Sequence, residues 1–205
     1  MKDSATYDWF EPLYANAAGD ASQVPWALPE AVPYLTNWLQ GVEGTGKSAA
    51  VVGCGLGNDA EALAAAGFEV TAFDVAKSAI AWAKQRFPNS SVNYVTADLF
   101  NLPAGWKGAF DVVFEFRTVQ ALPVSVRKEA IAQIATLPKP GGTLLMATYT
   151  RPSEALNDGP PWPLSASELA EFETLGLKII KKETFKKKEG RFGDRVQIEY
   201  QAPNQ

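Results

Sequence analysis

Two hydrophobic periodicities alternate along the chain. Short apolar runs, which are typical of buried strands, occupy residues 48–54, 68–74, 91–97, 110–116 and 143–149. Between them, segments with an apolar residue every three or four positions predict helices at 58–66, 76–87 and 124–137. Strands and helices that alternate in this order form parallel βαβ units with right-handed crossovers. The pattern therefore predicts an α/β fold, a Rossmann-like, doubly wound sheet with helices on both faces.

Further elements flank this core. Near the N-terminus, residues 29–40 carry one apolar helical face, made of Val32, Leu35, Trp38 and Leu39. The Lys-Pro-Gly-Gly segment at 139–142 predicts a turn ahead of the fifth strand. Ser165 and Glu168 have the spacing of a capping box, which predicts a helix over 166–175. Two last strands, 177–186 and 194–201, are joined through residues 189–193 and predict a hairpin at the edge of the sheet.

Length, charge and missing residue types limit the class of protein. A chain of 205 residues suits one domain, and no apolar run is long enough to span a membrane. The N-terminus lacks the apolar stretch of a signal peptide, so we predict a cytoplasmic protein. A net charge of −4 argues against a nucleic-acid partner and favours a small-molecule substrate, while the oligomeric state cannot be read from the sequence.

The chain has no histidine and a single cysteine, Cys54. Without histidine the commonest general base and zinc ligand are missing, which disfavours triad hydrolases and most zinc enzymes, and we predict no metal site. A lone cysteine allows neither an internal disulfide nor a redox pair.

Residues 41–48, GVEGTGKS, fit the phosphate-loop pattern GxxxxGK[ST]. A true phosphate loop follows a strand and opens a helix, so that backbone N–H groups converge on a phosphate. Here a predicted helix precedes the motif and a strand follows it. We therefore interpret the motif as a connection between that helix and that strand.

A second glycine-rich segment, VVGCGLGND, has the context that the first one lacks, because a strand runs into it and a helix follows. Its glycines, Gly53, Gly55 and Gly57, permit positive φ and let a ligand approach the backbone. A tight turn that binds no ligand is the alternative. The sequence therefore predicts a ligand-binding turn at the end of the first strand.

The residues after this turn indicate which ligand it binds. A dinucleotide fingerprint, GxGxxG, would place a glycine where Asn58 stands, and Asp59 would repel a pyrophosphate at the start of the helix. S-adenosylmethionine instead carries an ammonium and a sulfonium, which suit an acidic residue. We therefore favour S-adenosylmethionine over a nicotinamide cofactor.

Acidic residues end the next two predicted strands. Asp74, about 20 residues after the turn, can accept hydrogen bonds from both ribose hydroxyls. Asp98 can accept from the adenine amino group, and the Leu99 N–H can donate to an adenine nitrogen. The alternatives are helix capping for Asp74 and a role in the following turn for Asp98 and Leu99.

The ordered segments VVGCGLGND, FDVAKSAIAWAKQRFP, TADLF, FDVVFEF and PKPGGTLL resemble the class I S-adenosylmethionine-dependent methyltransferase family, from Val51 to Tyr200. The motifs VPWALP, VQALP and GPPWPLSASEL look like those of small bacterial enzymes related to thiopurine methyltransferase. The chain departs from this pattern at Arg117, where many of those relatives carry a neutral aromatic or small residue. The resemblance implies a seven-stranded, mostly parallel sheet whose last strand is antiparallel.

The resemblance also implies a cofactor site, with S-adenosylmethionine as methyl donor and S-adenosylhomocysteine as product. The glycine turn and Asp59 would hold the methionine part, Phe114 and Glu115 would line the wall beneath the sulfonium, and Trp26 would cover the cofactor. The complete predicted cofactor site is Trp26, Gly53, Cys54, Gly55, Gly57, Asp59, Asp74, Val75, Asp98, Leu99, Phe114 and Glu115. We expect residues 1–45 to form a flap and helix over the site, 46–150 the cofactor-binding core, and 151–205 the substrate side.

Methyl transfer requires alignment of nucleophile, methyl carbon and sulfur, and a base is needed only for an acceptor that keeps its proton. Without histidine, the candidate bases are the carboxylates Asp8, Glu11, Asp20, Glu30 and Glu115. We keep Glu115 and Arg117 as catalytic candidates and favour a soft or already ionised nucleophile.

Several aromatic and basic residues are candidates for substrate binding, the former by cation–π contact and the latter by pairing with a carboxylate. They are Trp9, Phe10, Tyr14, Arg117, Tyr149, Arg151 and Trp162. The alternatives are a packing flap for the aromatics and a solvated surface for the arginines. The lysines at 181, 182 and 186–188 are interpreted as an exposed strand edge rather than a nucleic-acid surface.

Two other functions fit the same residues. One is a protein that binds S-adenosylmethionine without catalysing transfer, as a regulator or partner subunit. The other is an NAD(P)-dependent oxidoreductase, which Asn58, Asp59 and the lack of a Tyr-Lys or His catalytic pair disfavour.

Overall fold

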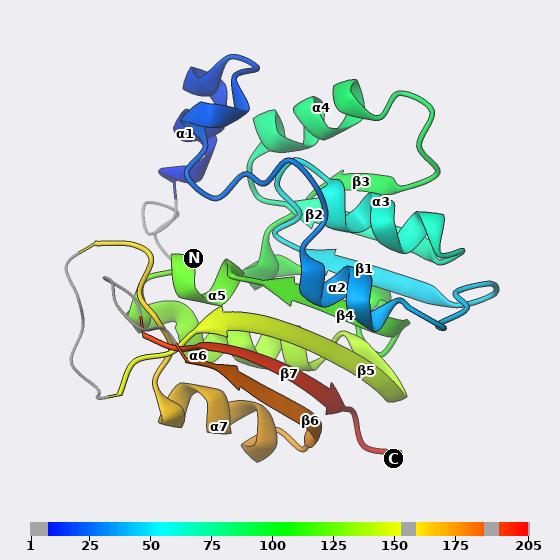
Figure 1. Ribbon diagram of the computed structural model, residues 1–205, viewed down its shortest axis with the longest axis vertical. Helices are drawn as coiled ribbons and strands as arrows, with labels where there is room; N and C mark the ends of the chain where they lie inside the picture. The colour runs from blue at the N-terminus through cyan, green and yellow to red at the C-terminus, as the bar shows by residue number, and fades with distance from the viewer. Residues whose placement is uncertain (1–7, 153–158, 187–192, 205) are drawn as a thin grey trace. The chain divides into compact units, whose positions relative to one another are not determined.

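The computed structural model describes residues 8–152, 159–186 and 193–204. Its strands form a seven-stranded sheet in the order β3-β2-β1-β4-β5-β7-β6, in which β7 runs antiparallel to β5 and β6. The predicted Rossmann-like fold with an antiparallel last strand is thereby confirmed. The chain divides into two compact units, residues 1–101 and 102–205, each with its own elements (Figure 1). The predicted functional division at residues 45 and 150 stays a prediction.

The first unit contains three parallel strands and the helices that connect them. Strands β1 (Ser48–Val52) and β2 (Glu69–Asp74) pair in parallel from Ser48 opposite Glu69, and β2 pairs in parallel with β3 (Asn93–Thr96). Helix α3 (Asn58–Ala65) joins β1 to β2, and α4 (Lys77–Arg86) joins β2 to β3. Strand β1 is buried from Ala49 onward, as expected for an apolar run in a parallel sheet.

The N-terminal part of this unit is more helical than predicted. Helix α1 (Phe10–Ala17), a 3-10 helix (Ala21–Gln23) and α2 (Pro33–Trp38) precede the sheet. The predicted start of a helix at residue 29 is wrong, because Val32 is extended and Pro33 takes the first helical position, where its missing N–H costs nothing. The segment 41–48 connects α2 to β1, as interpreted, and carries no helix after it.

Helix α1 was not predicted, although its apolar residues have helical spacing. Phe10, Leu13, Tyr14 and Ala17 stand at i, i+3, i+4 and i+7. They pack in a cluster that also contains Val24, Trp26, Leu56, Ala76, Ala79 and Trp82. The face of α1 is therefore covered by the glycine turn and α4.

The second unit contains four strands and three helices in its described part. They are β4 (Phe110–Phe116), α5 (Thr118–Ala121), α6 (Val124–Ala135), β5 (Pro138–Tyr149), α7 (Ala166–Thr174), β6 (Lys178–Phe185) and β7 (Arg195–Gln201). Two short 3-10 helices, Leu99–Asn101 and Ala104–Trp106, precede β4. The capping box at Ser165 and Glu168 and the hairpin of β6 and β7 are confirmed, while residues 187–192 of the connection lie outside the described residues.

The predicted turn at 139–142 is wrong, because β5 already begins at Pro138. Phe110 pairs with Pro138 and Val112 with Thr143, so the extra residues form an irregularity within the strand pair. Gly141 supplies the positive φ that such an irregularity needs, at 71°. Across the residues described, no helix is long and apolar enough to cross a membrane.

Candidate functional site

The glycine turn lies at the carboxyl end of β1. Gly53, Gly55 and Gly57 have φ values of 59°, 50° and 90°, a region that L-residues with a Cβ rarely adopt. The Cys54 N–H donates to Phe73 O on β2, and Gly57 N–H donates to Cys54 O. Three glycines are therefore required by the backbone of this turn, and Gly57 forms the N-cap of α3.

Asp74 ends β2 and holds the turn from the neighbouring strand. Its Oδ2 accepts from Gly55 N–H at 3.0 Å and its Oδ1 from Ala76 N–H at 2.9 Å. The N-cap of α4 is Ala76, so the alternative of Asp74 as a helix cap is wrong. Burial raises the pKa of Asp74 from its ordinary value, which the backbone donors partly offset. Because each carboxylate oxygen can accept two hydrogen bonds, Asp74 can still accept hydrogen bonds from a ligand.

Asn58 and Asp59, which argued against a dinucleotide, bind protein groups. Asp59 Oδ1 accepts from Val32 N–H at 2.8 Å, and burial raises the pKa of Asp59 to about 6. Asn58 Nδ2 donates to Leu28 O at 2.6 Å, and its Oδ1 accepts from Arg86 Nη2 at 2.8 Å. The start of α3 thus fixes the segment that leads into α2.

Aromatic side chains of the N-terminal segment lie against the glycine turn. Tyr14 is only 3% exposed, and its hydroxyl lies 3.0 Å from the point that a Cβ on Gly55 would occupy. Trp26 Nε1 donates to this hydroxyl at 2.7 Å, and the rings of Trp9 and Phe10 pack edge-on against Trp26. The four aromatic residues form one cluster beside the turn.

Helix α1 is also fixed by a carboxylate. Glu11 Oε2 accepts from Ser78 N–H at 3.0 Å and its Oε1 from Ser78 Oγ at 2.6 Å, at the first turn of α4. Burial opposes ionisation, yet the bonds from Ser78 and the charge of Lys77 leave the pKa of Glu11 below its ordinary value. A carboxylate at a helix N-terminus is also favoured by the helix dipole.

The residues predicted to hold adenine lie beyond β3. Asp98 Oδ1 accepts from Phe100 N–H at 2.9 Å, and buried Leu99 opens the 3-10 helix Leu99–Asn101. One oxygen of Asp98 therefore serves the following turn, as the alternative held. Val75, beside Asp74, is 36% exposed.

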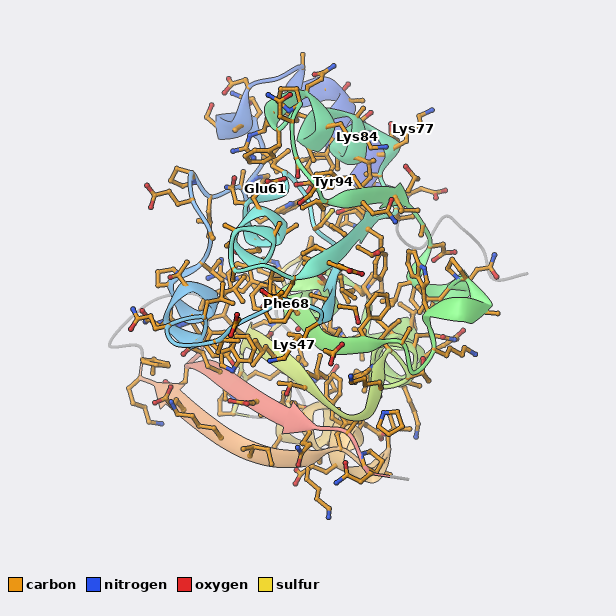
Figure 2. All side chains as sticks on the ribbon, turned by 90° about the vertical axis from the view of Figure 1, so that its right-hand side faces the viewer. Lys47, Glu61, Phe68, Lys77, Lys84 and Tyr94 are labelled. Carbon is orange, nitrogen blue, oxygen red and sulfur yellow. The ribbon has the colours of Figure 1, made fainter. Side chains whose placement is uncertain are left out.

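Two residues that support the glycine turn and the start of α3, Tyr94 and Arg86, were not predicted from the sequence. Tyr94 on β3 donates to Glu61 Oε1 at 2.7 Å, and Figure 2 shows both side chains on the same side of the unit. A Cβ on Gly57 would come closer than 3.0 Å to the Tyr94 hydroxyl. Arg86 Nη1 donates to Leu56 O at 2.5 Å. These contacts join residues about 30 or more positions apart, so no local pattern marks them.

In the second unit, Glu115 is fully buried at the carboxyl end of β4. Its Oε1 accepts from Thr118 N–H at 2.6 Å and Val119 N–H at 3.0 Å, while Oε2 has no partner among the described groups. Burial raises the pKa of Glu115 to about 7, against the lowering effect of these donors and of Arg127. Glu115 therefore fixes the start of α5. Its neighbour Phe114 is buried and its ring stacks with that of Phe116.

The two arginines proposed to bind substrate have different surroundings. Arg151 is buried, donates to Pro163 O and pairs with Glu168 Oε2 at 2.7 Å. Glu168 Oε1 pairs with Arg127 at 2.9 Å, so one carboxylate joins two buried guanidinium groups. Arg117 contacts the rings of Phe116 and Tyr149 instead. Neither arginine lies on a fully solvated surface.

Trp162 is anchored through its backbone in the second unit. Its N–H donates to Gln120 O at 2.8 Å, and its carbonyl accepts from Arg127 Nη2 at 2.6 Å. The indole is half-buried. Like the cofactor-site residues, Trp162 keeps its ligand-binding role only as a prediction.

Comparison with known proteins agrees with this fold and turn. Residues 50–142 match the family model described as "Methyltransferase domain". The seven-stranded fold and the glycine turn agree with the predicted family and cofactor class, and the matched residues make up a little under half of the chain. The narrower resemblance to thiopurine methyltransferase stays a prediction.

The chain is similar to a curated relative in sequence and to two solved structures in fold. A "Ubiquinone biosynthesis O-methyltransferase" of Azotobacter vinelandii is 34% identical over 131 residues, 62% of this chain and 56% of the relative. The N-methyltransferase NodS of Bradyrhizobium japonicum, in complex with S-adenosylhomocysteine, has a TM-score of 0.71 at 20% identity, covering 97% of this chain and 98% of NodS. The [4+2]-cyclase SpnF has a TM-score of 0.75 at 17% identity, covering 95% and 94%. The chain spans about half the length of the curated relatives it matches.

Proposed function

We propose that the protein transfers a methyl group from S-adenosylmethionine to a hydroxyl of a small molecule. The observation that carries the proposal is the buried carboxylate of Asp74, clamped to Gly55 N–H at the carboxyl ends of parallel strands. Ligands of open α/β sheets bind at these strand ends. The O-methyltransferase names of the curated relatives support an oxygen acceptor.

The residues at the turn fit this cofactor. Asp74 is a buried carboxylate, and no positively charged side chain is among the groups that shift its pKa. A ligand with hydroxyl donors and a positive charge would complement it, whereas a pyrophosphate would not. Asp59 and Glu61 in the first turn of α3 also favour a positively charged ligand over an anionic one.

S-adenosylmethionine, when bound, supplies a methyl carbon on a sulfonium, so that the acceptor oxygen forms the new C–O bond as the C–S electron pair passes to sulfur. Asp74 would hold the ribose hydroxyls, and Asp98 and Leu99 the adenine. Tyr14 and Trp26 would exclude water from the turn, which aligned displacement favours.

The acceptor must also lose its proton. Glu115 is fully buried, and the bonds from both of its backbone donors tie Oε1 to the start of α5. We therefore propose a phenolic acceptor, because a phenol ionises at lower pH than an alcohol and needs less help from a base.

Calorimetric titration with S-adenosylhomocysteine tests the cofactor assignment, with NADH as comparator. We expect Asp74→Asn to weaken binding about 10-fold or more, because hydrogen bonds to a charged acceptor contribute about 1.5–3 kcal/mol. Glu69→Gln is the matched control, since exposed Glu69 opens the same strand at its amino end. Equal binding by both variants, or preference for NADH, would contradict the assignment.

Release of S-adenosylhomocysteine in the presence of phenols, thiols and amines tests the transfer itself. Turnover with phenols would support the proposal, and turnover with thiols or amines alone would reject the oxygen acceptor. Cofactor binding without turnover on any acceptor would favour the second function, a non-methylating protein. The similarity to the [4+2]-cyclase SpnF is the observation in favour of that second function.

A further inference from the structure

Two arginines and three aromatic residues form a row across the carboxyl end of β4 and the strands beside it. We call Phe116, Arg117, Tyr149, Arg195 and Phe185 the arginine–aromatic row. The Arg117 guanidinium carbon lies 4.5 Å from the centroid of the Phe116 ring and 4.7 Å from that of Tyr149. The Arg195 guanidinium carbon lies 4.8 Å from the centroid of Phe185. Arg195 is also the direct partner of Tyr149 and of Phe185 in the strand ladders.

The backbone at Arg117 turns its side chain onto this row. Along a strand, neighbouring side chains point to opposite faces, so an extended Arg117 would leave the face of Phe116. Arg117 instead has φ of 63° and is the N-cap of α5. A left-handed conformation is unfavourable for a non-glycine residue. The bonds from Thr118 N–H and Val119 N–H to buried Glu115 hold this conformation in place.

Among the described residues, the positive charges of the row have no acidic partner. In the parts of the chain that the structure describes, neither Arg117 nor Arg195 pairs with a carboxylate. Asp194, next to Arg195, pairs with Lys186 at 2.6 Å. Burial, and then the charge of Arg195, lower the pKa of Arg117 from its ordinary value. Two neighbouring guanidinium groups without counter-charge are unfavourable, and an anion would offset this cost.

The geometry favours a planar anion. The rings of Phe116 and Tyr149 lie against the Arg117 guanidinium, and its Nη2 donates to the Tyr149 hydroxyl at 3.0 Å. A guanidinium has five N–H donors in one plane, and two of them can donate parallel hydrogen bonds to a carboxylate. The other arginine that the sequence suggested, Arg151, is already neutralised by Glu168.

We propose that the arginine–aromatic row binds a carboxylate of the methyl acceptor, so that the substrate is an aromatic or similarly flat carboxylic acid. The inference rests on the proposed methyltransferase function, because it assigns the acceptor of that same reaction. The row lies at the carboxyl ends of β4 and β5, the sheet edge at which ligands of this fold class bind.

The test compares benzoate with benzamide as probes, titrated into the full chain saturated with S-adenosylhomocysteine. We expect benzoate to bind about 10-fold or more tighter than benzamide, and Arg117→Gln to remove this preference, because charged hydrogen bonds contribute about 1.5–3 kcal/mol. Arg195→Gln should reduce the preference independently. Lys182→Gln, which removes an exposed positive charge from β6, should retain it.

Equal or undetectable binding of the two probes to the wild type would overturn the inference, and so would equal losses in Arg117→Gln and Lys182→Gln. Tighter binding of inorganic phosphate than of benzoate, with the phosphate affinity lost in Arg117→Gln, would assign the row to a tetrahedral anion instead. Circular dichroism checks that each variant is folded. We assign S-adenosylhomocysteine binding to Asp74 in the first unit. Failure of the wild type to bind S-adenosylhomocysteine would therefore reject the proposed function, whereas loss of the preference for benzoate alone would reject only the carboxylate site.

Discussion

The buried carboxylate of Glu115 gives a prediction that separates electrostatics from packing. Glu115→Gln keeps an oxygen that accepts from Thr118 N–H and Val119 N–H. The new amide nitrogen replaces Oε2, which has no partner in the described structure. The substitution therefore removes a buried charge and preserves the two bonds that hold the start of α5.

The magnitude follows from the pKa of Glu115, which is about 7 in the fold and 4.5 ordinarily. A carboxylate with a raised pKa binds its proton more tightly in the folded state, so it stabilises the fold below the ordinary pKa and loses this contribution as pH rises. Between about pH 5 and pH 8, linkage predicts a loss of roughly 2–3 kcal/mol from this group. Above about pH 8 the loss is complete, because the group is then ionised in both states.

Denaturant unfolding of wild type and Glu115→Gln at several pH values measures this loss. We expect similar free energies of unfolding near pH 5 and a variant more stable by about 2–3 kcal/mol near pH 8. Asp59 and Asp74 titrate in both proteins, so their contributions cancel in the difference. Glu173→Gln makes the same charge change at an exposed site of α7 and should follow the wild type. Parallel profiles for wild type and Glu115→Gln would refute the reasoning.

Two further substitutions test contacts that lie within each of the two units. Gly57→Ala should lower the free energy of unfolding by about 2–4 kcal/mol, because φ is positive there and the new Cβ would meet the Tyr94 hydroxyl. Gly46 also has a positive φ but lies in open space, so Gly46→Ala should lose only the free energy that the left-handed backbone costs alanine. Equal denaturant midpoints for the two variants would exclude the steric contact. Glu168→Ala should cost about 3–5 kcal/mol, since it removes the carboxylate that pairs with two buried guanidinium groups. Glu171→Ala on the same helix, whose ion pair is exposed, should cost under about 1 kcal/mol, and thermal unfolding that ranks the two helix variants equally would contradict the buried network.

Local pattern was sufficient for much of the fold. Short apolar runs predicted the strands because burial on both faces of a parallel sheet requires apolar residues at consecutive positions. The capping box of Ser165 and Glu168 was predictable because its two partners are three residues apart. Turn geometry likewise required glycine at 53, 55 and 57, whose positive φ the structure bears out.

The predicted boundaries of helices and strands were wrong where two local patterns compete. Pro33 set the start of α2, although apolar spacing suggested an earlier one. The Lys-Pro-Gly-Gly segment reads as a turn, yet pairing with β4 draws it into β5. Helix α1 was not predicted, although its apolar residues have helical spacing, because it is only eight residues long and its face carries aromatic residues, whose helix propensity is low.

The sequence by itself determined the order of strands and helices, the glycine turn and the types of residue placed at the strand ends. Only the tertiary structure decided which partner each polar side chain has: Asp59 binds Val32 N–H, Arg151 is neutralised by Glu168, and Arg117 is left between aromatic rings. The physical reason is the distance along the chain over which each interaction acts. Periodicity and capping act within a few residues, whereas a charge in a folded protein is balanced by groups that the fold brings from distant parts of the chain.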